Sequence, residues 1–306
     1  MIHGVLIVDK PQGPTSHDVV GRLRRILRTR AVGHAGTLDP LATGVLVIGV
    51  GEGTKLLQHL TGADKGYVAT LRLGEQTDSL DAQGTVVAQR PVPSELTRAR
   101  IEQVASTFLG GQLQRVPEIS AVKVDGERLY ARARRGDTVC VPEREVTVHA
   151  LEILRTDLPE IELRVHCSKG FYVRALGRDL AHALGTVGHL TALRRTHSGS
   201  FAVSEAAPSR LLQMDPELAA VELRARMLPL ALALRDHPSC VLNERGAAEV
   251  RHGRPVLQDH MVRCDPVAPG ELPVALVDEH GTLRALGRAE ADRIVVIRGM
   301  SPAFPG

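Results

Sequence analysis

The chain has 306 residues, of which 43% are hydrophobic and 24% charged, and its formal net charge is +3. This balance excludes disordered and collagen-like chains and is typical of an ordinary folded protein. No apolar run approaches the roughly 20 residues of a membrane-spanning helix, and MIHGVLIVDKPQG lacks the pattern of a secretory signal. We therefore expect a cytoplasmic protein whose four cysteines are reduced.

The first predicted elements are a strand and a capped helix. GVLIVDK (4–10) is typical of a strand, and Thr15 and Asp18 have the spacing of a capping box. The apolar residues that follow recur at helical spacing: Val19, Leu23, Ile26 and Leu27. Arg22 and Arg25 occupy the other side, and Arg28 and Arg30 lie nearby. Two interpretations of these arginines stay open, a solvated helix face or a contact with RNA phosphates.

The remaining elements of the first 235 residues mix helices and strands without a βαβ rhythm. Further strands are predicted at 44–51, 66–74, 146–155, 160–167 and 187–196, and helices at 53–60, 94–108 and 172–184. The fold class is therefore α+β, with a mixed, largely antiparallel sheet and flanking helices.

The pattern changes near residues 230–240, where LPLALALRDHPSC forms a proline-bounded connector. Three short apolar runs follow, PVALVDE, LRALGRA and RIVVIRG, separated by glycine and acidic residues. These runs predict a small β-barrel-like module. We therefore divide the chain into a first domain at 1–235 and a second domain at 236–306.

Two familiar site patterns are absent from the sequence. The strand GVLVIGVG leads into GTKLL, but a phosphate-binding loop would end Gly-Lys-Ser/Thr, and this chain has Gly53-Thr54-Lys55. Thirteen histidines invite a metal site, yet there is no HExxH and no His/Cys cluster at ligand spacing. We expect no metal.

The five lysines, against 33 arginines, all fall in stretches marked by glycine or proline: Lys10, Lys55, Lys65, Lys123 and Lys169. Our hypothesis is that these positions need a compact ammonium, which the planar fork of arginine does not replace. Chance placement is the alternative.

One carboxylate stands out in the glycine-rich stretch GHAGTLDPLATGVLVIG (33–49), where Asp39 lies between Leu38 and Pro40. A helix N-cap with Pro40 at the first helical position is one interpretation. Gly44 would end such a helix after about one turn, which is too short to persist alone. The other interpretation is that the loop fixes and aims the carboxylate.

The same stretch resembles the catalytic motif of the TruB family of tRNA pseudouridine synthases. The resemblance continues in family order through VDKPQGPTSHDVV, DKGYVATLRLGEQTDSLDAQG, VPEISAVKVDGERLYARARRG, CSKGFYVRALGRDLAHALG and LRRTHSG, and the C-terminal module looks like a PUA domain. The chain departs from the family at Ile119, where an aromatic residue is usual, and at Glu118.

The resemblance implies that the T-loop uridine of tRNA, at tRNA position 55, is isomerised to pseudouridine, with no cofactor or metal. Asp39 would be the catalytic carboxylate, acting on the ribose, and Arg174 would pair with it and keep it ionised. Whether Asp39 bonds to the sugar or removes its 2′ proton stays open.

The resemblance also implies residues that bind the substrate. Such a target must be flipped out of the folded loop before it reacts. Tyr67 would support the flipped base, Tyr172 and Leu193 would line its pocket, and His34 would pack where the base left. Lys169 and Lys10 would anchor a phosphate or a loop.

The implied partner is the T-arm stem-loop of tRNA, bound through the catalytic domain, a thumb-like segment at 115–145 and the C-terminal module. We expect a monomer with no obligate protein partner and no membrane association. Two other functions stay open: an RNA-binding or tRNA-folding module in which isomerisation is secondary, and a guide-RNA-dependent synthase of the dyskerin type.

Overall fold

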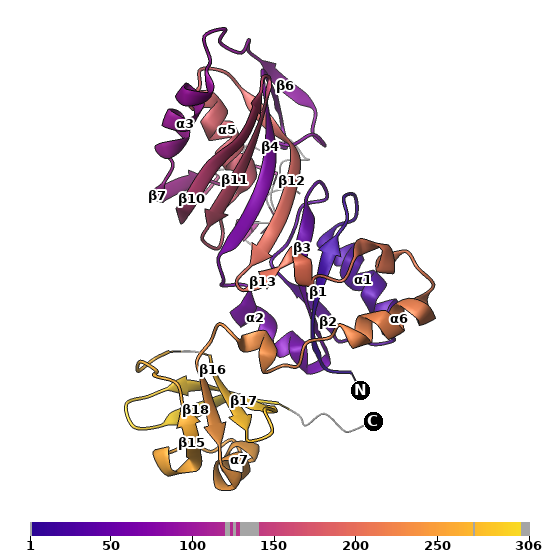
Figure 1. Ribbon diagram of the computed structural model, residues 1–306, viewed down its shortest axis with the longest axis vertical. Coiled ribbons are helices and arrows are strands. Elements are labelled where there is room, and N and C mark those ends of the chain that lie inside the picture. Colours follow the sequence, from indigo (N-terminus) through magenta and orange to yellow (C-terminus); the bar gives the residue numbers. More distant parts are fainter. Residues whose placement is uncertain (1, 120–122, 125–126, 129–140, 272, 301–306) are drawn as a thin grey trace.

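The computed structural model describes residues 2–119, 123–124, 127–128, 141–271 and 273–300. A nine-stranded sheet forms the first domain (Figure 1). Its main path runs through β1 (Gly4–Lys10), β3 (Thr43–Val50), β12 (Gly188–Ser198), β4 (Lys65–Leu73), β11 (Glu160–Cys167), β10 (Glu143–Asp157) and β7 (Gly110–Arg115), with β2 (Val32–Ala35) on β3 and β13 (Phe201–Ala202) on β12. Only β12 and β3 pair in parallel among these described strands, so the predicted mixed, largely antiparallel sheet is confirmed.

One face of the central sheet is apolar because alternate residues of its strands are apolar. On β4, Tyr67, Ala69 and Leu71 are buried, whereas Val68 and Thr70, which alternate with them, are more open. Two helices, α3 (Arg98–Ser106) and α5 (Val173–Ala183), cover that side (Figure 1). The helix α5 therefore packs on β12 and β4 of the sheet.

The helix α1 (Ser16–Ile26) begins as predicted, with the Thr15–Asp18 capping box in place and its apolar face buried. Arg22 donates 2.8 Å to the carbonyl of Leu212, and Arg28 lies 2.9 Å from Glu217 in α6 (Pro216–Ala225). Two of the four arginines therefore fasten neighbouring segments of the protein. For Arg22 and Arg28, the structure favours neither of the two interpretations, a solvated helix face or a contact with RNA phosphates.

The C-terminal module is an open five-stranded sheet. Its order is β15 (Met261–Cys264), β14 (Ser239–Leu242), β16 (Val274–Asp278), β17 (Leu283–Ala289) and β18 (Ile294–Gly299), with α7 (Glu244–Arg251) packed on it. The described strands do not close into a barrel. Val277 and Leu286 share an apolar cluster with Val5 and Ile7, so the module packs against the first sheet.

Two of the four cysteines lie side by side in the C-terminal module. Cys240 and Cys264 are register partners on β14 and β15. Cys167 is free and buried. Two strands that the sequence pattern did not predict therefore bring distant cysteines together.

Several elements differ from the prediction in extent. The helix expected at 94–108 spans only 98–106, and the one expected at 53–60 divides into η1 (Gly51–Leu56) and α2 (Leu57–Leu60). Hairpins β5 (Glu75–Thr77) with β6 (Val86–Gln89) and β8 (Lys123–Val124) with β9 (Glu127–Arg128) were not predicted. The remaining short helices are η2 (Val203–Glu205), η3 (Ser209–Leu212), η4 (Leu232–Leu234) and η5 (Gln258–His260).

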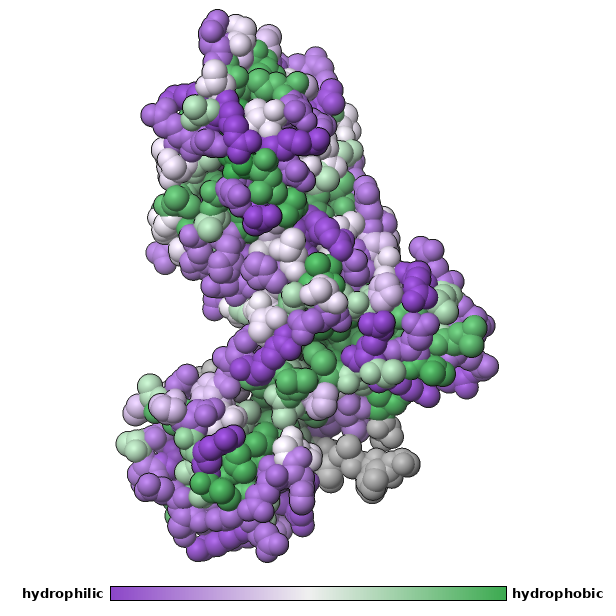
Figure 2. All heavy atoms as spheres, viewed as in Figure 1, coloured by the Kyte–Doolittle hydropathy of each residue, from purple (hydrophilic) through white to green (hydrophobic). Residues whose placement is uncertain are grey.

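Most of the thumb-like segment at 115–145 lies outside the described residues. On the face shown in Figure 2, polar side chains cover much of the surface and apolar ones form smaller patches. No helix in the described ranges combines the length and the apolar character needed to cross a membrane.

Candidate active site

The loop that carries Asp39 joins β2 to β3 and contains no helix. A single turn, in which the Ala42 amide donates 3.0 Å to the Asp39 carbonyl, takes the place of the helix that an N-cap would begin. The helix-cap interpretation of Asp39 is therefore wrong. The Ser16 hydroxyl holds the loop from below, donating 3.1 Å to the Leu38 carbonyl and accepting 2.9 Å from the Leu38 amide.

Lys10 holds the other side of the same loop. Its ammonium donates to the carbonyls of Pro11 at 3.0 Å, Pro40 at 3.4 Å and Ala42 at 2.7 Å. The side chain is fully buried, which lowers the pKa of Lys10 to about 8. Lys10 therefore has no surface for a phosphate, and its contacts match the loop-anchor alternative.

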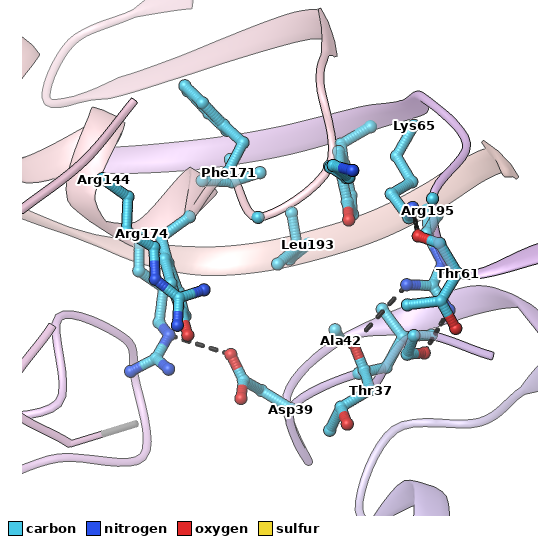
Figure 3. Close-up of a pocket in the computed structure, with 18 of the residues that line it drawn as sticks. Thr37, Asp39, Ala42, Thr61, Lys65, Arg144, Phe171, Arg174, Leu193 and Arg195 are labelled. Carbon is cyan, nitrogen blue, oxygen red and sulfur yellow. Dashed lines mark hydrogen bonds and ion pairs between the residues drawn. The ribbon is translucent and has the colours of Figure 1, made fainter. Parts of the chain in front are cut away.

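Arg174 lies in the first turn of α5 and reaches across to the loop (Figure 3). Its Nε is 2.9 Å from Oδ2 of Asp39; the arginine side chain is 5% exposed and the aspartate 37%. Further donors of the guanidinium reach the carbonyls of Ser79 at 2.6 Å and Ile119 at 3.2 Å. The two partners implied by the resemblance are therefore in contact, and the arginine is fixed by backbone as well as by charge.

A second carboxylate, which the sequence reasoning missed, lies behind this pair. Oδ2 of Asp81 is 3.8 Å from Nε of Arg174, and Oδ1 accepts from the Ser79 hydroxyl at 2.7 Å and the Gln83 amide at 3.1 Å. Asp81 is buried. Its signal was present in the quoted motif TDSLDAQG, where an acid follows another at short spacing inside a turn.

A cavity of about 850 Å³ opens over Asp39. Sites for small molecules span roughly 300–1,000 Å³, so the space suits a flipped nucleotide. Four of the predicted residues line it together with Asp39 and Arg174: Tyr67, Lys169, Tyr172 and Leu193. The carboxylate therefore faces a cavity and is partly shielded from bulk solvent.

Gln114 positions one of these residues by a contact that no motif indicated. Its amide donates 3.0 Å to the Tyr172 carbonyl and accepts 2.8 Å from the Tyr172 amide. The side chain is buried on β7. The backbone just before α5 is thereby fixed relative to the sheet.

Five cationic side chains line the cavity, and they differ in whether other protein groups already bind them. The five are Lys65, Arg144, Lys169, Arg174 and Arg195. Lys65 donates to the carbonyls of Thr61 at 2.8 Å and of Ala63, and its burial, with the nearby charge of Arg195, lowers the pKa of Lys65 to about 8. Arg144 and Lys169 have no side-chain hydrogen bond or ion pair within the described residues. These two are available to a charged ligand.

His34 does not line the cavity. It lies on β2 with its ring edge-on to that of His17, the centroids being 5.3 Å apart. Burial, with the nearby charge of His17, lowers the pKa of His34 to about 4. Its Nδ1 atom is buried and has no hydrogen-bond partner within the described residues. The ring is therefore neutral near pH 7 and stands beside the site.

The structure thus brings six of the eight predicted site residues to one cavity, whereas His34 and Lys10 flank the loop outside it. In the described ranges, no group of three or more His, Cys, Asp or Glu side chains could hold a metal ion.

Comparison with known proteins identifies the family. Residues 24–173 match the model of the N-terminal domain of TruB family pseudouridylate synthases. The tRNA pseudouridine synthase B of Arthrobacter sp. (strain FB24) is 44% identical over 94% of this chain and 92% of the relative, and that of Corynebacterium glutamicum (strain R) is 42% identical over 91% and 93%.

Solved structures agree at the level of the fold. An H/ACA RNP bound to a substrate RNA containing 2′-deoxyuridine matches with a TM-score of 0.75 and 25% identity over 98% of this chain and 85% of that one. A Cbf5-Nop10-Gar1 complex matches with the same TM-score and 27% identity over the same shares. The chain belongs to the TruB family of pseudouridylate synthases.

Proposed function

We propose that this chain isomerises the T-loop uridine of tRNA, at tRNA position 55, to pseudouridine, and that it acts alone. The observation that carries the proposal is the contact between Asp39 and Arg174 at the edge of a cavity large enough for a nucleotide. Relatives at 42–44% identity over more than nine-tenths of the chain are named tRNA pseudouridine synthase B, which supports tRNA as the substrate.

The reaction needs one fixed anionic oxygen near the ribose. The N1–C1′ bond breaks, the base turns over, and a C5–C1′ bond forms, while C5 loses a proton and N1 gains one. Two routes to this rearrangement are open, and Asp39 can serve both. Its carboxylate can bond to C1′, or it can take the 2′ proton. Arg174 holds that oxygen in place and balances its charge in a partly dry site.

The other cavity residues suit a flipped base. Tyr67 and Leu193 are 7% and 8% exposed and offer an aromatic and an aliphatic surface, and Tyr172 completes the pocket. Lys169, at the cavity rim, would bind a phosphate of the RNA. His34, neutral and half-buried beside the loop, would pack against RNA where the base has left.

The remaining parts have roles in binding. We assign residues 1–235 to the synthase domain, 115–145 to a thumb-like RNA-binding segment and 236–306 to a PUA-like RNA-binding domain. The chain would work in the cytoplasm as a monomer, without a cofactor, and unfolding of the T-arm during binding would give it a secondary role as a tRNA folding chaperone.

One experiment separates this function from its two alternatives. Purified protein is incubated with an unmodified T-arm stem-loop and no other RNA, and pseudouridine is mapped. Product with the wild type but not with Asp39→Ala supports the proposal. Binding of both proteins without product supports the folding-module function, and product only after a guide RNA is added supports the guide-dependent function.

A further inference from the structure

Arg195 is a buried cation that no carboxylate balances among the described residues. Its side chain is 1% exposed, and its Nε donates 2.6 Å to the Val45 carbonyl while one Nη donates 3.0 Å to the Gly36 carbonyl. A buried charge is costly unless hydrogen bonds satisfy it, so these carbonyls determine where the guanidinium lies. Val45 belongs to β3 and Gly36 to the loop, three residues before Asp39.

The same guanidinium reaches the tyrosine that lines the cavity. Arg195 and Tyr67 are direct partners in the register of β12 and β4, so their side chains leave the same face of the sheet, and the guanidinium lies close enough to influence the phenol. A guanidinium has no acceptor. Arg195 can therefore act on the phenol only as a hydrogen-bond donor or through its charge.

This contact also acts on the charge of the phenol. Burial raises the pKa of Tyr67, and the charge and hydrogen bond of Arg195 oppose that rise. Removal of the guanidinium should therefore raise the pKa further.

We propose that Arg195 is a positioning residue that links Tyr67, its register partner on β4, to the Gly36 carbonyl in the loop that carries Asp39. It thereby sets where the flipped base lies relative to Asp39, and this role rests on the function proposed above. Three groups, the Val45 carbonyl, the Gly36 carbonyl and the phenol, need a planar fork with several donors. A lysine ammonium at this position does not reach all three.

A double-mutant cycle tests the link to Tyr67. Single-turnover rates at saturating T-arm stem-loop are measured for Arg195→Lys, Tyr67→Phe and the double variant. Each single variant should lose roughly ten- to a hundredfold, the size expected of a hydrogen bond to a charged group. The rate of the double variant should fall much less than the product of the two single losses, because both substitutions remove the same interaction. Losses that multiply would overturn the proposal.

Arg194→Lys is the matched control. Arg194 is the preceding residue on β12, is 42% exposed and pairs with Asp9 at 2.8 Å. The control therefore makes the same arginine-to-lysine change at a position outside the cavity. Its rate should stay within about threefold of wild type, since an exposed pair contributes little. If Arg195→Lys does not unfold cooperatively, Tyr67→Phe decides: an unchanged rate overturns the proposal and a tenfold loss supports it.

A second measurement needs no activity and so separates this inference from the proposed function. 3-Fluorotyrosine is placed at position 67, and its ionisation is followed by ¹⁹F NMR in the wild type and in Arg195→Gln. The phenol should titrate at a higher pH in the variant. Equal titration curves in two folded proteins would overturn the proposal, whether or not the wild type forms pseudouridine.

Discussion

Arg174 lies 2.9 Å from Asp39 and is itself almost completely buried, whereas Asp39 keeps 37% of its side chain exposed. The arginine belongs to the protein interior and the carboxylate to the cavity. Since Arg174 also donates to the carbonyls of Ser79 and Ile119, its position does not depend on Asp39. The ion pair therefore determines the orientation of the Asp39 carboxylate, whereas backbone carbonyls determine the position of Arg174.

Arg174→Lys should lower the single-turnover rate by roughly a hundredfold or more. A lysine keeps the charge but not the fork that reaches Asp39 and two carbonyls at once, and one or two charge-assisted hydrogen bonds are lost. Rapid-quench measurement at saturating RNA checks this. Arg178→Lys is the control on the same helix, because Arg178 pairs with its half-buried neighbour Asp179 and does not contact Asp39; similar losses in both variants would contradict the account.

Asp81→Asn should have a smaller effect than removal of Asp39, roughly tenfold to a hundredfold on the rate. Asparagine keeps the hydrogen bonds to Ser79 and Gln83 but removes the second negative charge near Arg174. The guanidinium would then be less well balanced and less well oriented. Single-turnover rates of the two asparagine variants at 39 and 81 give the comparison, and equal loss would mean that Asp81 itself acts on the substrate.

Much of this site could be predicted from the sequence because its motifs are local. The capping box at Thr15, the alternation of β4 and the apolar face of α5 all appeared as predicted. Asp81, Gln114 and Arg195 were missed because each acts through a partner far away in the chain. Such contacts follow from strand order and register, and residue spacing does not encode them.

The same reason explains the errors. An acid before a proline is a good helix cap, but Lys10 and Ser16 hold this loop in a single turn that does not continue as a helix. The contact between Cys240 and Cys264 was missed because the strand at 261–264 has little apolar pattern.

Lys10→Arg and Lys65→Arg should each lower the free energy of unfolding by about 1–3 kcal/mol, because a larger side chain must fit a closed site. Both ammonium groups are buried and donate to backbone carbonyls. Lys169→Arg, on the open cavity rim, should leave stability unchanged. Urea denaturation checks all three, and equal stability throughout would contradict the hypothesis that compact cations are needed.

Alkaline pH should affect activity and stability in opposite directions. Lys10 and Lys65 release their protons near a pKa of about 8 when folded, against 10.5 for the ordinary side chain. Between these values the unfolded chain binds more protons, so the contribution of these groups to stability rises with pH. The rate should fall over the same window, because a neutral amine holds the Pro40 and Ala42 carbonyls less firmly.

The stability part is isolated by comparing the wild type with Lys10→Gln from roughly pH 7 to 10. The difference in unfolding free energy should shift in favour of the wild type as pH rises. A shift in favour of the variant would show that the lysine keeps its proton in the folded state.

The salt dependence of binding should distinguish RNA contacts from structural arginines. Lys169→Gln should reduce the slope of log affinity against log salt by about one, because one phosphate contact is lost. Arg22→Gln should leave the slope unchanged and lower the free energy of unfolding by about 1–3 kcal/mol, since Arg22 satisfies the Leu212 carbonyl. A reduced slope for Arg22→Gln and an unchanged slope for Lys169→Gln would mean that RNA phosphates bind at α1.

The most direct test of the whole account compares Asp39→Asn with the wild type on one unmodified T-arm stem-loop, measuring the dissociation constant and the yield of pseudouridine together. Asparagine keeps the size of the side chain and removes its charge. We expect no detectable turnover and an affinity within about tenfold of wild type, because phosphate contacts dominate RNA binding. Substantial turnover, or loss of binding and turnover together, would contradict the claim that this carboxylate does the chemistry.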